Sequence, residues 1–222
     1  MDGLQSEGLR MKARELVESV VPYTYGDAHF NEVCKYYQKG YGTTCGCLCH
    51  WMLYNLGAKN PDIVNWTDAA RGLKYLGGAN ISRIHHKGMA PFVNCIGPSN
   101  PLLRGIRPAC GDIVFIHKFN DDRTFGPQNK EHVFVFLEEQ AGGRWATAES
   151  GQEGGTDSKF KFRMLFAPTG EVKPATPVRI SDADGAKPSD GDRTVIGWLD
   201  ISQLDYLPDS LNTYRQMGRC GF

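Results

Sequence analysis

Three closely spaced cysteines are the most reactive feature of the sequence. Cys45, Cys47 and Cys49 follow a segment rich in glycine and threonine, and His50 comes directly after them. Clustered thiols of this kind can bind a metal, take part in redox chemistry or act as nucleophiles. Zinc is disfavoured, because structural zinc sites are built on C-x2-C pairs, whereas C-x-C-x-C on a helix directs its thiolates to different faces. We therefore predict no metal site and no organic cofactor.

Cys45 is the strongest candidate for a nucleophile, because it stands where a glycine-bearing turn meets a helix. The apolar residues that follow recur at helical spacing and predict a helix ending at Gly57, with Thr43 or Thr44 as its amino-terminal cap. Backbone amides and the helix dipole at such a position favour a thiolate and can also hold an oxyanion. The other two thiols are expected to pack as small hydrophobic side chains, and the same structural role is the alternative for Cys45.

A nucleophilic thiol needs a base, and His132 opens a predicted strand in the run EHVFVFLEE. If Gln140 pairs with Gly143 across the following turn, His132 and Glu149 lie on one face of the hairpin as diagonal neighbours. Glu149 would then orient the imidazole and stabilise its protonated form.

Two features of the chain could change this assignment. A bulge at Gly142 or Gly143 would reverse the faces of the hairpin. His117, at the end of another predicted strand, is the alternative base. We expect the sulfur of Cys45 to lie within about 4 Å of a ring nitrogen of His132.

The elements that must position these residues change character along the chain. Helical patterns come first, at residues 4–20, 28–37, 45–57 and 67–76, and strand patterns follow at 112–117, 132–138, 144–150, 159–166 and 194–199. Residues 167–193 are rich in proline, glycine and aspartate and predict a long loop, and a short helix is expected over 201–207. This order predicts an α+β fold in which amino-terminal helices pack on an antiparallel β-sheet. We expect one domain, residues 1–222, with a helical amino-terminal extension at 1–39 and a loop-rich insertion at 151–193.

Composition excludes several classes of protein. The 222 residues contain 25 basic and 25 acidic side chains, so a nucleic-acid binder is not expected. The sequence has no run of eighteen apolar residues and no signal-peptide pattern at its start, which favours a soluble protein made in the cytoplasm. Seven cysteines, an odd number, argue against a disulfide framework.

The order of the motifs resembles that of papain-like amidases of the NlpC and CHAP type. The residues that carry the resemblance are Cys45 at the head of a helix, then the strand GDIVFI, then HVFVFLEE, then AESGQ, whose glutamate is similar to the third triad member of CHAP proteins. The resemblance implies a papain-like fold with a triad of Cys45, His132 and Glu149. It also implies an oxyanion and substrate-binding region that contains Tyr41, Thr44 and Gln152.

The resemblance further implies hydrolysis of an amide bond in the peptide stem of bacterial peptidoglycan. We expect an antibacterial toxin that is exported, for example by type VI secretion, acts in the periplasm of a target bacterium and is inhibited by a cognate immunity protein. A phage lysin that is released through a holin is the alternative to an exported toxin. Two alternatives stay open: a cysteine-dependent deamidase or acyltransferase that acts on a protein, and a non-catalytic papain-like interaction domain.

Overall fold

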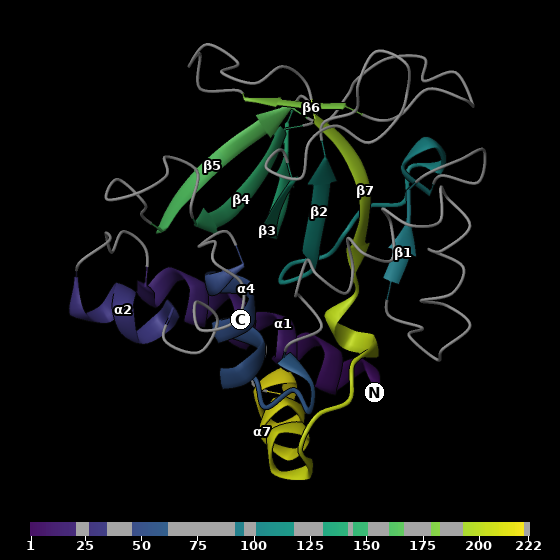
Figure 1. Ribbon diagram of the computed structural model, residues 1–222. Coiled ribbons are helices and arrows are strands. Elements are labelled where there is room, and N and C mark those ends of the chain that lie inside the picture. Colours follow the sequence, from purple (N-terminus) through teal and green to yellow (C-terminus); the bar gives the residue numbers. More distant parts are fainter. Residues whose placement is uncertain are drawn as a thin grey trace.

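The computed structural model describes ten segments of the chain, residues 1–20, 27–34, 46–61, 92–95, 101–117, 131–141, 144–150, 160–166, 179–182 and 193–219. Within them the protein combines helices with an antiparallel sheet, as predicted (Figure 1). The helices are α1 (Gly3–Val20), α2 (Ala28–Cys34), α4 (Cys47–Asn55) and α7 (Pro208–Arg219), with short 3-10 turns η2 (Pro101–Arg104) and η5 (Ile201–Gln203). The helix predicted over residues 67–76 falls outside these segments.

Among the described residues, seven strands form one antiparallel sheet in the order β1-β7-β2-β3-β4-β5-β6. Their bounds are β1 (Phe92–Asn94), β2 (Ile113–His117), β3 (Glu131–Gln140), β4 (Arg144–Ser150), β5 (Phe160–Phe166), β6 (Arg179–Asp182) and β7 (Arg193–Leu199). β6 also pairs with the first residues of β7, so the six strands β7, β2, β3, β4, β5 and β6 close into a barrel. β1 lies outside this barrel and pairs with the later part of β7, residues 197–199. In Figure 1, β6 lies across the top of this barrel, between the ends of β5 and β7.

Alternate residues of the barrel strands belong to two separate cores. On β3, Val133 and Val135 pack with residues of α1, α2, α4 and α7, whereas Phe134 and Phe136 pack with Trp145 and other apolar residues of the strands. Since a six-stranded barrel has room inside only for side chains, the face that carries the helices is the outer one. β3 is therefore apolar on both faces, as its unbroken hydrophobic run VFVFL requires.

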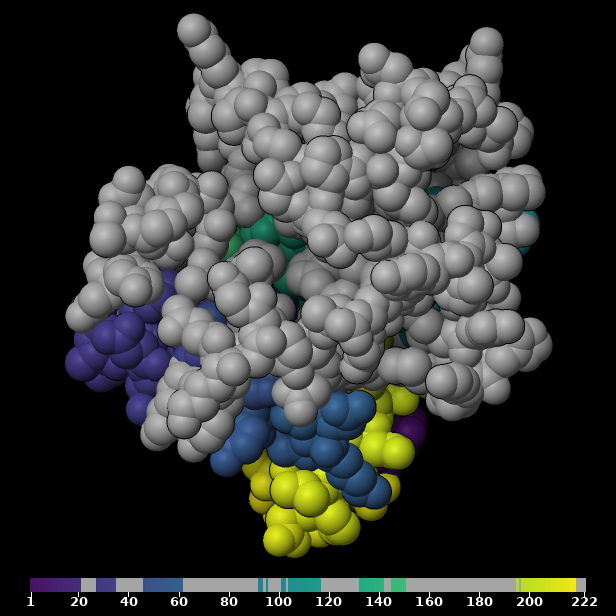
Figure 2. All heavy atoms as spheres, viewed as in Figure 1, coloured from purple at the N-terminus to yellow at the C-terminus, as the bar shows by residue number. Residues whose placement is uncertain are grey.

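The helix layer is held together by close backbone contact between α1 and α7. Gly8 and Gly218 have no side chain at the points where these helices meet, and a Cβ atom at either would overlap a carbonyl oxygen, that of Tyr214 or of Leu4. The hydroxyl of Tyr214 donates to the carbonyl of Leu56 at the end of α4. Figure 2 shows the α4 (blue) and α7 (yellow) surfaces in contact at the lower edge of the molecule.

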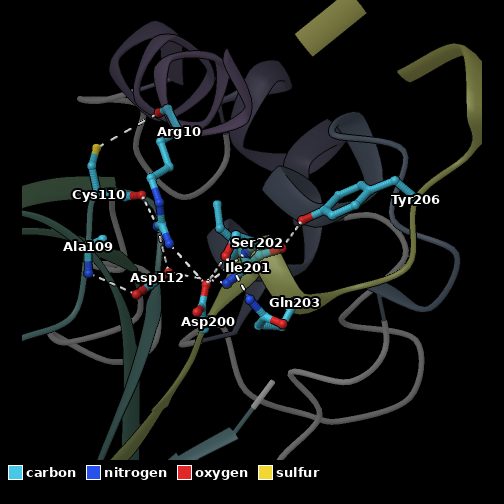
Figure 3. A network of polar contacts seen from close by, with 9 residues as sticks. All are labelled: Arg10, Ala109, Cys110, Asp112, Asp200, Ile201, Ser202, Gln203 and Tyr206. Carbon is cyan, nitrogen blue, oxygen red and sulfur yellow. Dashed lines mark hydrogen bonds and ion pairs between the residues drawn. The ribbon is translucent and has the colours of Figure 1, made fainter. Parts of the chain in front are cut away.

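A partly buried polar network joins the helices to the barrel (Figure 3). The guanidinium of Arg10, on α1, donates to Asp112 at 2.8 Å and to Asp200 at 2.9 Å. Asp112 precedes β2, and its carboxylate also accepts the backbone N–H groups of Ala109 and Ile201. Burial raises the pKa of Asp112 to about 6, although Arg10 acts in the opposite direction. The predicted GD-led strand therefore begins at a carboxylate with a structural role.

The structure corrects the predicted turn of the β3–β4 hairpin. Gln140 pairs with Arg144 and not with Gly143, which by itself would move His132 and Glu149 to opposite faces. A bulge at Leu137 takes up the extra residue, so beyond it Val135 pairs with Ala148, as the predicted register required. The shift at the turn and the bulge cancel each other, so His132 and Glu149 stay on the same face, as predicted.

The long loop predicted over residues 167–193 is wrong in part, because β6 lies within it and closes the barrel. The insertion predicted at 151–193 therefore contributes two barrel strands, β5 and β6. Residues 1–39 were predicted to form an extension, but their described part belongs to the main fold, because Leu9, Ala13 and Val17 of α1 are core residues. The sequence patterns did not predict α7. They predicted a short helix at 201–207, and the structure has the 3-10 turn η5 at the start of that segment.

Candidate active site

His132 lies near the start of β3, on the inner face of the barrel. It pairs with Ile116 of β2, and the β2–β3 register is regular from Ile113 to His117. Ile116 and Phe134 both belong to the inner core, so the position of His132 is fixed by strand alternation on two neighbouring strands. The centroids of the His132 and Phe134 rings are 6.3 Å apart.

Glu149 reaches His132 from the end of β4. The Nε2 atom of His132 and the Oε2 atom of Glu149 are 2.7 Å apart, and the two side chains are 1% and 0% exposed. The predicted contact between these residues is therefore confirmed. A hydrogen bond this short, away from water, is favoured by ionic character in one or both partners.

Thr147 contacts the other oxygen of the same carboxylate. Its Oγ1 atom lies 3.2 Å from Oε1 of Glu149 and is the donor when the carboxylate is ionised. Thr147 is completely buried and shares the inner face with Glu149, two positions along β4. Sequence analysis missed Thr147, although the same alternation that placed Glu149 beside His132 also places Thr147 on that face.

The orientation of the pair determines which imidazole nitrogen could exchange a proton with a substrate or nucleophile. Glu149 engages Nε2 of His132, so the ring would accept or donate a catalytic proton through Nδ1. Nδ1 is bonded to the ring carbon that carries the side chain, and it therefore lies closer to the β3 backbone than Nε2. A nucleophile that uses this base would have to lie near the first residues of β3.

The helix that follows Cys45 begins later than predicted. α4 starts at Cys47 with Gly46 as its cap residue, and this cap makes no side-chain hydrogen bond. The predicted caps, Thr43 and Thr44, lie outside the described residues. The first intrahelical hydrogen bond runs from the amide of His50 to the carbonyl of Gly46. Cys45 itself lies outside the described residues, and its predicted distance to His132 cannot be read from them.

Cys47 and Cys49 pack in the outer core, as predicted for small hydrophobic side chains. Their helix contacts the barrel on the outer face, where Val133, Val135 and Ala148 lie. The His132–Glu149 pair is on the inner face of the same strands. Residues of α4 and the pair are therefore separated by the barrel wall, an arrangement that the sequence did not predict.

The remaining predicted site residues are not placed. Tyr41, Thr44 and Gln152 lie in segments that the structure does not describe. The alternative base, His117, pairs with Glu131, one register position beyond the Ile116–His132 pair. His50 is buried on α4.

Neither a metal site nor a membrane-spanning segment is found in the described part of the chain. No three histidine, cysteine, aspartate or glutamate side chains among those residues are grouped so that they could hold a metal ion. None of the helices described combines the length and apolar character needed to cross a bilayer.

Comparisons with protein-family models, with curated proteins and with solved structures found no significant match.

Proposed function

We propose that the protein is a papain-like cysteine hydrolase that cleaves an amide bond in the peptide stem of bacterial peptidoglycan. The observation that carries the proposal is the buried hydrogen bond between His132 and Glu149. A carboxylate in this position fixes the tautomer of the imidazole and stabilises the imidazolium formed during acid–base catalysis. The nucleophile assigned by the proposal is Cys45.

The proposed reaction has two steps. The Cys45 thiolate attacks the amide carbonyl, and the leaving amine takes a proton from Nδ1 of His132 as the C–N bond breaks. Water then attacks the thioester and gives a proton to the same nitrogen, which releases the carboxylic acid and regenerates the thiolate. Backbone amides at the start of α4 are the proposed donors to the tetrahedral oxyanion. The resemblance assigns Tyr41, Thr44 and Gln152 to the same oxyanion and substrate-binding region.

The position of α4 sets a condition on this mechanism. Because the helix packs on the outer face and His132 is on the inner face, Cys45 must reach the end of the barrel at which β3 begins and β4 ends. The reaction would then take place at the barrel rim, with Nδ1, the ring nitrogen that does not contact Glu149, as the proposed proton carrier.

The substrate follows from the order of the motifs, which resembles that of wall amidases. The proposal includes export, for example by a type VI secretion system, action in the periplasm of a target bacterium, and a cognate immunity protein that blocks the site. The proposed reaction requires no metal and no organic cofactor.

The test uses purified protein and purified peptidoglycan, with the released fragments identified by mass spectrometry. Cys45→Ala and His132→Gln should each reduce the initial cleavage rate by about 1,000-fold or more, because both act in the same step. Cys49→Ala is the matched control, since it removes a neighbouring thiol that packs in the core. It should keep most of the parental activity.

Each contrary outcome has a defined meaning. Cleavage by Cys45→Ala at the parental rate would refute the nucleophile. If folded parental protein releases no wall fragments, the substrate is wrong, and a deamidase or acyltransferase that acts on a protein becomes the better assignment.

A non-catalytic interaction domain is the second candidate, and a specific observation favours it. His132 and Glu149 are almost completely buried on the inner face, where a histidine–carboxylate pair can simply satisfy its own polar groups. Alkylation of Cys45 by iodoacetamide, followed by peptide mass spectrometry, separates the two. A catalytic pair predicts that His132→Gln slows alkylation and moves its pH dependence to higher pH, whereas a structural pair predicts no change.

A further inference from the structure

We propose that Thr147 is a positioning residue for the His132–Glu149 pair, which it holds in the ionised, correctly oriented form. Its effect on turnover rests on the proposed function, but its effect on the protonation of the pair does not.

The carboxylate of Glu149 is held at both oxygens. Oε2 contacts Nε2 of His132 at 2.7 Å, and Oε1 accepts from Thr147 at 3.2 Å. The terminal torsion of a glutamate side chain is soft, so one hydrogen bond alone would leave the carboxylate plane poorly fixed. The second bond fixes that plane, and through it the imidazole.

Threonine is well suited to this task at this position. Its β-branched side chain has few rotamers, and its place on β4 puts the hydroxyl on the same face as Glu149. Thr147 has no exposed surface, so water does not compete for the hydroxyl. In a buried site a hydrogen bond to an ionised group is stronger than the same bond at the surface.

The hydroxyl also selects where the proton of the pair resides. With one shared proton, the pair is either imidazolium with carboxylate or neutral imidazole with carboxylic acid. Donation from Thr147 to a charged carboxylate is stronger than its bond to the neutral acid. Thr147 therefore stabilises every state in which Glu149 is ionised, and its loss favours the neutral acid.

Thr147→Val removes the hydroxyl and keeps the shape, whereas Thr147→Ser restores the hydroxyl. We expect the pH at which the pair loses its last proton, followed by NMR of labelled histidine and glutamate, to rise in the Val variant and to return in the Ser variant. Infrared difference spectra of the Val variant against the parent, recorded above the pKa of Asp112, should show an additional protonated carboxyl. Ser150→Ala is the matched control, because Ser150 is an equally buried hydroxyl on the same strand but on the outer face.

The proposal is overturned if Thr147→Val titrates as the parent does, or if Ser150→Ala produces the same change. If Thr147→Val does not fold, Thr147→Ala provides the same comparison with a smaller side chain.

Activity gives the second readout. If the parent cleaves peptidoglycan, Thr147→Val should lower kcat about tenfold with KM unchanged, and Thr147→Ser should recover it. If the titration changes as expected but the parent releases no fragments, the proposed function has failed and the role of Thr147 stands. A cleaving parent whose kcat is unaffected by Thr147→Val would refute the positioning role in catalysis.

Discussion

Glu149 contacts His132 through Nε2, the ring nitrogen farther from the backbone, at 2.7 Å inside the barrel. This single contact joins two strands and fixes the orientation of the imidazole. A structural pair and a catalytic pair share this geometry, so stability and reactivity have to be measured separately.

The first prediction concerns the free energy that couples the pair. Removal of one partner from a buried ion pair costs about 3–5 kcal/mol, because the other polar group remains buried without it. We expect His132→Phe and Glu149→Leu to cost less together than the sum of the two single changes, by about 1–3 kcal/mol. Urea unfolding of the parent, both single variants and the double variant measures this coupling.

An exposed ion pair supplies the control for this double-mutant cycle. Lys12 and Glu15 on α1 form an ion pair at 3.0 Å with both side chains exposed. The same cycle with alanine at these positions should give a coupling below about 0.5 kcal/mol. Equal coupling in the two cycles would contradict the view that burial strengthens the His132–Glu149 contact.

The face shared by His132 and Glu149 was predictable because strand alternation is a local property. β3 holds a regular register with β2 from His132 to Val135, and β4 holds one with β5 from Thr147 to Glu149. The bulge at Leu137 compensates for the wrongly assigned turn. Which face is the inner one was not predictable, since β3 is apolar on both sides. That distinction arises only when β6 pairs with β7 and closes the barrel, which the alternation within a single strand does not display.

α7 and β6 were missed for physical reasons that differ. α7 is mostly polar, and its apolar stripe consists of three residues, Leu211, Tyr214 and Met217, that pack on the core; the sequence interpretation overlooked this short stripe. β6 is a four-residue strand within a proline-rich segment, and its short pairings with β5 and β7 are long-range. By contrast, α1 was predicted with nearly its observed bounds, because its apolar stripe is continuous.

The second prediction concerns pH. Burial raises the pKa of Asp112 to about 6 from an ordinary value of 3.8, so between these values the folded state binds more protons than the unfolded state. The contribution of Asp112 to the free energy of unfolding therefore falls as the pH rises from about 4 to about 6, by up to about 3 kcal/mol. Subtracting the pH profile of Asp112→Asn from that of the parent isolates this contribution.

Arg10 provides the check on this assignment, because its guanidinium lowers the pKa of Asp112. Arg10→Met should move the midpoint of the Asp112 titration to higher pH, as followed by NMR of labelled aspartate. A difference profile that rises with pH, or a midpoint that moves down in Arg10→Met, would contradict the prediction.

The third prediction concerns the contact between α1 and α7. A Cβ atom at Gly8 would overlap the carbonyl of Tyr214, so Gly8→Ala must separate the helices and should cost about 1–3 kcal/mol or more. Gly3→Ala is the control, since nothing lies within 4 Å of its added Cβ atom and alanine is the better helix former. Thermal and urea unfolding should show a loss for the first variant and no loss for the second.

The fourth prediction tests whether β1 is held to the barrel by one small residue. A Cβ atom at Gly197 of β7 would overlap the carbonyl of Val93 and the ring of Phe92, so Gly197→Ala should push β1 away. The other edge of β7 pairs with β2, including Phe115 with Gly197, and the three atoms nearest the added Cβ atom all belong to β1. Hydrogen exchange should therefore accelerate in residues 92–94 and stay slow in β2 and β3. Equal acceleration in all three strands would mean that β1 and the barrel unfold as one unit, and unchanged exchange in β1 would mean that the close approach at Gly197 does not hold it.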